Sequence, residues 1–147
     1  MNDLTNVDGF TVEAKIHFQN ARKGRKRIRR GPAPPEGPKA VPRLSRLLAL
    51  AIRFEGLLAA GEVRDYADLA RLGQVTRARM TQVMNLLNLA PGIQEEILFL
   101  PPTTNVRDAI PERRVRLVAA IADWHRQRLA WDELKVIQES TRRTAVS

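Results

Sequence analysis

The stretch DYADLARLGQVTRARMTQVMNLLNL, residues 65–89, decides how the central part of this chain folds. Asp65 is suited to cap a short helix over Tyr66–Leu72, and Thr76 is suited to cap a second helix over Arg77–Leu89. Both residue types are favoured there because their side-chain oxygens accept a hydrogen bond from an early helical N–H group. We therefore predict two short helices joined by a tight turn.

Small and apolar residues lie where two closely crossing helices need them. Ala70 lets the helices approach each other, and Val75 and Met80 fix the angle between them. This is the arrangement of a helix-turn-helix. The turn departs from the usual spacing, because Gly73 lies three residues after Ala70 and Gln74 occupies the usual place of the turn glycine. Gln74 must therefore tolerate the turn geometry, or the turn is non-standard.

The second helix presents a polar face that is suited to DNA. A helix-turn-helix places this helix in the major groove, where Arg pairs with guanine and Gln or Asn with adenine. Arg77 and Gln82 are favoured as base-reading residues over Thr81 and Asn85, although a solvated face is the default for most helices. Thr76 and Arg79 are expected to contact phosphate or base. The candidate site on this helix is Thr76, Arg77, Arg79, Thr81, Gln82 and Asn85.

The net charge of +9 is concentrated in one short segment. Residues 21–42 carry eight basic residues and one Glu, and prolines follow the basic run. Charge repulsion and proline predict a flexible, extended linker over residues 21–41. We expect its cations to bind DNA phosphates, with a solubilising or targeting tail as the alternative. These cations are Arg22, Lys23, Arg25, Lys26, Arg27, Arg29 and Arg30.

Residues 10–18 alternate between apolar and polar side chains, which predicts a β-strand with one buried face. The rest of the chain shows no second strand pattern, and a single strand is not stable alone. We therefore expect this strand to pair with another copy or with a partner protein, or to be disordered.

From Pro42 onward the apolar residues follow a helical period, which predicts an all-α domain of about six helices. The fifth helix is expected to start at Pro111 and the sixth to carry Asp132 and Glu133 in its first turn. The apolar side of the fifth helix would be formed by Leu117, Val118, Ile121, Trp124 and Leu129. The predicted segments are a strand-bearing arm over 1–20, the linker over 21–41, the helix-turn-helix domain over 42–140 and a tail over 141–147.

Several function classes are disfavoured by composition. The chain has no cysteine, which excludes disulfides and Cys-ligated metal sites. His17 and His125 are the only histidines, and no acidic cluster surrounds either one. We predict no enzymatic activity, no cofactor and no metal site. No apolar run is long enough to span a bilayer, so we expect a cytoplasmic, nucleoid-associated protein.

The segment LARLGQVTRARMTQVMNLLNLAPGIQEEIL is similar to the helix-turn-helix region of ParB/KorB-type partition proteins. The resemblance covers roughly residues 43–100 and implies DNA binding through the helix that begins at Thr76. It does not imply nucleotide hydrolysis, because the signatures of the nucleotide-binding domain are missing. The layout of the whole chain also resembles small DNA-binding proteins of phages and mobile elements that accompany large serine recombinases.

These observations predict sequence-specific binding of double-stranded DNA by a homodimer. The expected role is that of an accessory factor or regulator in the recombination or partition of a mobile element, with a serine recombinase as protein partner. One alternative is a transcriptional regulator of a phage or mobile element. Another is an adaptor that adds the strand over residues 10–18 to the sheet edge of a larger DNA enzyme.

Overall fold

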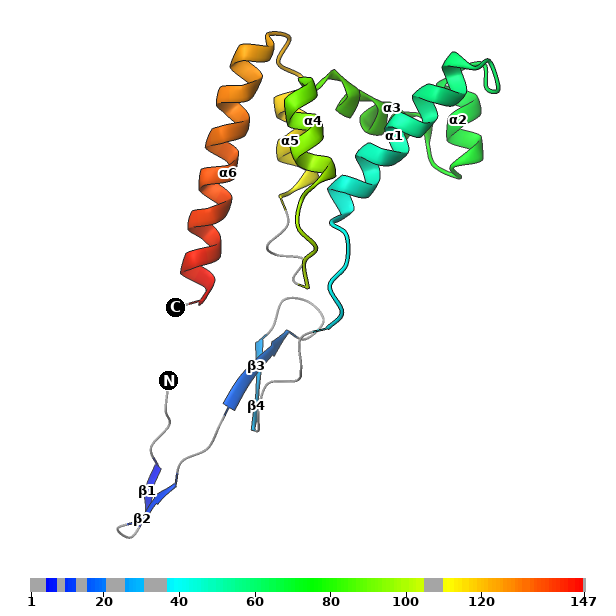
Figure 1. Ribbon diagram of the computed structural model, residues 1–147. Helices are drawn as coiled ribbons and strands as arrows, with labels where there is room; N and C mark the ends of the chain where they lie inside the picture. Colours follow the sequence, from blue (N-terminus) through cyan, green and yellow to red (C-terminus); the bar gives the residue numbers. More distant parts are fainter. Residues whose placement is uncertain are drawn as a thin grey trace. The chain divides into compact units, whose positions relative to one another are not determined.

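The computed structural model divides into two compact units, residues 1–37 and residues 38–147. In the second unit the described residues form six α-helices. The protein is therefore mostly helical, which confirms the predicted all-α character of the chain after residue 42. The structure describes residues 5–7, 10–12, 16–20, 26–30, 37–104 and 110–146 (Figure 1).

Two short β-hairpins are described in the first unit. β1 (Thr5–Val7) pairs antiparallel with β2 (Phe10–Val12), and β3 (Ile16–Asn20) pairs antiparallel with β4 (Lys26–Arg30). The predicted single strand over residues 10–18 is not observed, because its beginning lies in β2 and its end in β3. Each of these strands has its pairing partner in the same chain. A second copy or a partner protein is therefore not needed to pair them.

β4 lies inside the segment predicted to be an extended linker, residues 21–41. The sequence KRIRR does not alternate between apolar and polar residues, so it carries no strand signal. Both strands of a lone hairpin are edge strands, where Lys and Arg are common. β4 thus pairs with β3 through backbone groups, although the pattern of its side chains does not predict a strand. The residues of this segment over 21–25 and 31–36 lie outside the described residues.

The described part of the second unit contains six α-helices and one 3-10 helix. Pro42 precedes the first helix, and Pro91 is the first residue of the fourth, as its fixed φ favours. No helix in this described part is long and apolar enough to cross a membrane. The elements are α1 (Arg43–Ala59), α2 (Tyr66–Leu72), α3 (Arg77–Met84), the 3-10 helix η2 (Asn85–Asn88), α4 (Pro91–Leu98), α5 (Glu112–Ala119) and α6 (Trp124–Val146).

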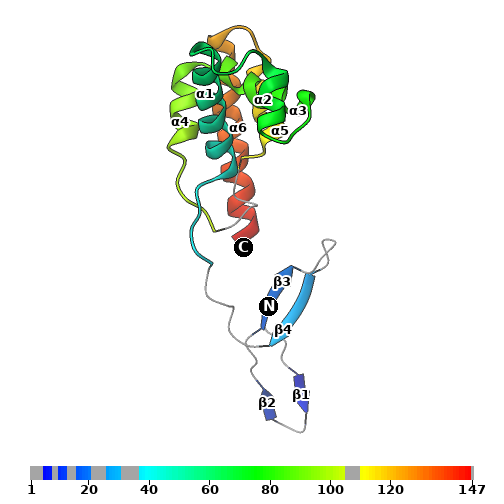
Figure 2. The same ribbon diagram turned by 90° about the vertical axis from the view of Figure 1, so that its right-hand side faces the viewer.

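Two apolar clusters hold these helices together, and α1 contributes to both. In one cluster Leu48 of α1 packs with buried residues of η2, α4, α5 and α6, among them Ile97 and Trp131. In the other, Ala51 of α1 packs with Leu69 of α2 and with buried residues of α3. Burying one large apolar side chain contributes roughly 1.5–3 kcal/mol. Helix α1 therefore joins the α2–α3 pair to the remaining helices (Figure 2).

The boundary between the last two helices differs from the prediction. Asp123 caps α6, since its Oδ1 accepts a hydrogen bond from the backbone N–H of Arg126 at 2.9 Å. The helix therefore begins at Trp124, and the prediction that Asp132 and Glu133 lie in a first turn is wrong because both lie well inside α6. The same helix continues through the residues predicted to be a tail.

The break before α6 also changes which apolar side chains are buried. Leu117, Trp124 and Leu129 were expected on one apolar face but are 67%, 49% and 54% exposed. Val118 is buried as expected, together with Val115. The cause is geometric, because one continuous helix was assumed and the interruption after Ala119 changes the direction in which later side chains point.

A buried glutamine fastens α6 to the other helices. The Gln127 side chain is 1% exposed, and its Oε1 accepts a hydrogen bond from the backbone N–H of Ala90 at 2.8 Å. Its Nε2 donates to the carbonyl oxygens of Asn88 at 3.0 Å and Ile121 at 2.7 Å. One side chain thus satisfies backbone groups at the start of α4, at the end of η2 and in the link between α5 and α6.

Candidate nucleic-acid interface

Helices α2 and α3 are joined by a turn of four residues, Gly73–Thr76. Asp65 begins α2 as predicted, because its Oδ1 accepts hydrogen bonds from the backbone N–H groups of Ala67 at 2.8 Å and Asp68 at 2.9 Å. At the other end, the backbone N–H of Gln74 donates to the Arg71 carbonyl oxygen at 3.2 Å and that of Val75 to the Ala70 carbonyl oxygen at 3.0 Å. This pair of bonds is the one with which many helices end, so α2 stops at this turn.

Gln74 adopts the left-handed backbone conformation in this turn, with φ of 52°. No other described residue except a glycine has a positive φ. Gln74, four positions after Ala70, thus adopts the turn conformation that is usually taken by a glycine at this place. Gly73 precedes it with a negative φ of −79°, and a Cβ there would lie in ordinary contact, 3.4 Å from the Leu69 carbonyl oxygen and from Met80 Cε. The left-handed conformation of this turn is therefore taken by Gln74 and not by the glycine.

Helix α3 is capped by Thr76 and held by its apolar face. The Thr76 Oγ1 accepts a hydrogen bond from the Arg79 backbone N–H at 3.1 Å. Met80 and Val83 are buried against α1 and α2. The helix is shorter than the predicted Arg77–Leu89, because the 3-10 helix η2 replaces its last turn.

Three predicted site residues lie four positions apart, Arg77 and Thr81 on α3 and Asn85 at the start of η2. Arg77 and Asn85 are exposed, and Thr81 between them is half-buried. The Thr81 hydroxyl donates to the Arg77 carbonyl oxygen at 3.1 Å. Residues four apart are neighbours on a helix surface, so these side chains form one stripe. The stripe offers a guanidinium, a hydroxyl and an amide to solvent.

Arg79 points elsewhere, toward α5. Its guanidinium forms a two-pronged ion pair with the carboxylate of Glu112, with Nη2 at 3.0 Å from Oε2 and Nη1 in contact with Oε1. The hydrogen bond from Arg79 holds the pKa of Glu112 below its ordinary range, and the same bond raises the pKa of Arg79. This residue thus ties α3 to α5.

Gln82 also lies on the side of α3 that faces α5. Its Oε1 accepts a hydrogen bond from Arg79 Nη1 at 3.3 Å, and the side chain is half-buried. It borders a cavity of about 210 Å³ between α3, η2 and α5, which Asn85 also lines. Arg116 of α5 lines the same cavity, although the sequence pointed only to the core role of this helix. No local signal could reveal this neighbour, since 34 positions separate the two residues.

The basic segment belongs to the first unit. Four of its seven predicted DNA-binding residues, namely Lys26, Arg27, Arg29 and Arg30, lie in β4. The other three, Arg22, Lys23 and Arg25, lie outside the described residues. Within the described ranges no three His, Asp or Glu side chains come together in a way that could hold a metal ion.

Comparisons with known proteins add no relative to this geometry. The chain matches no protein-family model, no curated protein and no solved structure. Function is therefore inferred from the α2–α3 pair, the stripe of Arg77, Thr81 and Asn85, and the distribution of charge.

Proposed function

We propose that this protein binds double-stranded DNA sequence-specifically, with α2 and α3 acting as a helix-turn-helix and α3 entering the major groove. The observation that carries the proposal is the stripe of Arg77, Thr81 and Asn85, with exposed ends, which runs along a short helix into η2, while Met80, Val83 and Met84 of this helix are buried. The major groove, about 12 Å wide, admits one α-helix. A rigidly packed helix can therefore present these three side chains to base edges.

The chemistry of the stripe matches the hydrogen-bonding groups of bases. Arg77 can donate two hydrogen bonds to the O6 and N7 atoms of guanine, and Asn85 can bond both N6 and N7 of adenine. Thr81 offers a hydroxyl and a methyl group between them. In this proposal Arg79 acts as a positioning residue, because its guanidinium is held by Glu112.

The net charge of +9 supports attraction to a polyanion. In the proposal the basic residues of the first unit bind phosphates and add affinity without sequence preference. Helix-turn-helix proteins read two half-sites through a two-fold dimer, so we propose a homodimer on a near-palindromic site.

The proposed biological role is that of an accessory factor or regulator of a mobile element's recombination or partition, with a serine recombinase as partner. This role rests on the resemblance described above, and regulation of transcription would use the same interface. Every strand of these two-stranded sheets is an edge strand, so the adaptor hypothesis stays an alternative prediction. No specific observation favours that hypothesis as a second function of these residues.

Competition binding with Arg77→Ala tests the proposal. A preferred duplex is first selected from randomised sequences with the full chain, and each variant is then measured on this duplex and on a scrambled one. We expect Arg77→Ala to reduce the preference for the selected duplex at least about tenfold, the low end for a bidentate base contact. Asn85→Ala should reduce it at a different base pair.

Arg128→Ala is the matched control, because it removes the same charge from an exposed position on α6. Its preference should stay within about twofold of the wild-type value. Thermal unfolding of each variant verifies that the fold is intact. If no duplex is enriched, or if Arg77→Ala behaves like the control, α3 is not the reading helix.

A further inference from the structure

A pocket of about 230 Å³ lies at the other side of the helical unit from α2 and α3. Leu44 at the start of α1, Leu100 after α4 and Ile110 before α5 form its apolar walls. The fourth wall is the C-terminal half of α6, which extends beyond the other helices (Figure 1). None of the residues that line the pocket belongs to α2 or α3, so DNA on α3 leaves it open.

Two of the three charged side chains that α6 places at this pocket are already engaged. Lys135 Nζ lies 2.8 Å from the Glu96 Oε2, and Glu139 Oε1 lies 3.8 Å from the Arg143 Nε. Their charges are therefore largely balanced by neighbours. Arg142 is the third charged residue, and it differs from both.

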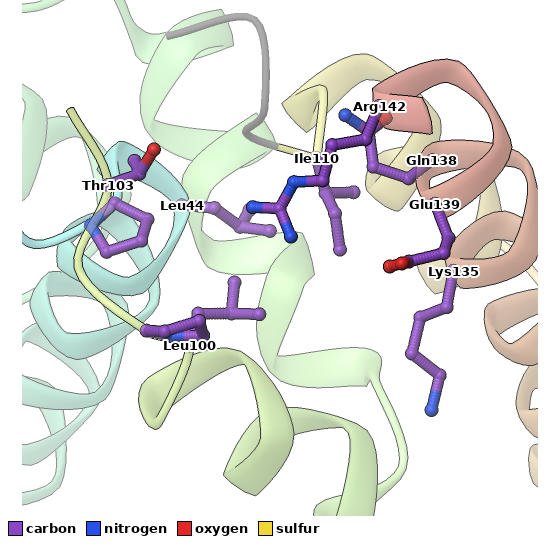
Figure 3. Close-up of a pocket in the computed structure, with 10 residues that line it drawn as sticks. Leu44, Leu100, Thr103, Ile110, Lys135, Gln138, Glu139 and Arg142 are labelled. Atoms are coloured by element: carbon purple, nitrogen blue, oxygen red, sulfur yellow. The ribbon is translucent and has the colours of Figure 1, made fainter. Parts of the chain in front are cut away.

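Arg142 places a guanidinium at the edge of the apolar walls formed by Leu44, Leu100 and Ile110. It forms no ion pair with any acidic side chain of the described ranges, although Glu139 is its close neighbour on α6. Figure 3 shows its guanidinium extending from α6 into the pocket, toward the apolar side chains of Leu44 and Ile110. A guanidinium at this position can form a bidentate pair with a carboxylate.

The size of the pocket limits what it can hold. Sites for cofactors and drug-sized ligands usually measure about 300–1,000 Å³, so this pocket is small for them. It is suited to one aliphatic side chain that inserts between Leu44, Leu100 and Ile110. A carboxylate next to this side chain would then meet Arg142.

We propose that this pocket docks a short segment of a partner protein in which an aliphatic side chain stands beside an Asp or Glu. The aliphatic group removes the apolar walls from water, and the carboxylate balances Arg142. The site is separate from the proposed DNA-reading helix, so the protein would hold DNA and a second protein at the same time. This inference does not depend on α3 reading bases.

Selection of short peptides displayed on phage against the full chain tests the proposal. We expect enriched peptides to share an aliphatic residue flanked by Asp or Glu. The probes are then the most enriched peptide and its variant with each acid replaced by the amide, measured by fluorescence anisotropy. The acidic peptide should bind at least about tenfold more tightly than the amide variant, as expected for a hydrogen-bonded charge pair.

Arg142→Gln should weaken binding of the acidic peptide by a similar factor, whereas Arg143→Gln, an adjacent charge outside the pocket, should change it less than about twofold. Arg142→Glu should bind the peptide in which Lys replaces the acid. This result would show that the substitution changes the charge pair between residue 142 and the peptide and leaves the fold intact. Arg142 is exposed, so these variants are expected to fold.

Four results would overturn the proposal. They are enrichment of peptides without an acid, equal binding by Arg142→Gln, binding of octanoate as tight as that of the peptide, and loss of a dimer in Arg142→Gln. The third would assign the pocket to a free small carboxylate and the fourth to a second copy of this chain. Because Arg142→Gln should leave the DNA preference unchanged, failure here is distinguishable from failure of the proposed function.

Discussion

Replacing Gln127 by Met should strongly destabilise the helical unit. Methionine has a similar length but cannot form the three hydrogen bonds of the Gln127 side chain, which is 1% exposed. The Ala90 N–H would then be left without a partner, and Ala90 is itself fully buried. The carbonyl oxygens of Asn88 and Ile121 lie nearer to solvent, so water can replace part of what they lose.

The magnitude follows from these three bonds. A typical intramolecular hydrogen bond contributes about 1 kcal/mol net, and a buried donor left unpaired costs about 1–3 kcal/mol. We therefore expect Gln127→Met to lower the free energy of unfolding by about 2–4 kcal/mol, a large part of the stability of a typical domain. Urea unfolding monitored by far-ultraviolet circular dichroism and by tryptophan fluorescence measures this difference.

Arg128→Met controls for the change in helix propensity, because it places the same residue at an exposed position of the same helix. Its free energy of unfolding should change by less than about 0.5 kcal/mol. If Gln127→Met is no more destabilised than this control, the buried glutamine does not hold α6 in place, and the account of its three hydrogen bonds is refuted.

Two further predictions concern the turn and the ion pair of α3. Gln74→Gly should raise the free energy of unfolding by about 0.5–1 kcal/mol, because glycine adopts a positive φ without strain. Gln74→Ala keeps the Cβ and should give no such gain in urea unfolding; an equal gain would contradict this reasoning. Glu112→Gln should destabilise the unit by about 1 kcal/mol at about pH 7, and this difference should shrink as the pH falls through the folded-state pKa of Glu112. Because the pKa of Glu112 is depressed in the folded state, the ion pair stabilises the protein above the ordinary carboxyl pKa and stops doing so as the pH falls through the folded-state pKa. A difference in stability that does not change with pH would show that the ion pair is not its source.

The sequence predicted the helical unit well where the signals were local. The caps at Asp65 and Thr76 involve backbone groups two or three residues away, so the residue type alone indicated them. The unusual position of Gln74 followed from counting residues after Ala70, and the positive φ agrees with that count. Prediction failed at α6, where the capping signal of Asp123 was overlooked and a continuous helix was assumed.

The first unit was less predictable, because strand pairing depends on two segments rather than one. The alternation over residues 10–18 indicated extended structure, but it did not reveal the break between β2 and β3. The charged segment that forms β4 has no alternation, and its pairing comes from backbone groups that all residues except proline share.

The sequence by itself determined how α2 and α3 begin, where the turn between them falls and which polar residues α3 carries, because these features depend on contacts within one turn of helix. Only the tertiary structure decided which of those residues form the stripe and which are held by hydrogen bonds to other side chains. Arg79 is held by Glu112, 33 positions away, and Gln127 reaches backbone groups 37 and 39 positions away. Such contacts follow from how whole helices pack, and no periodicity along the chain records them.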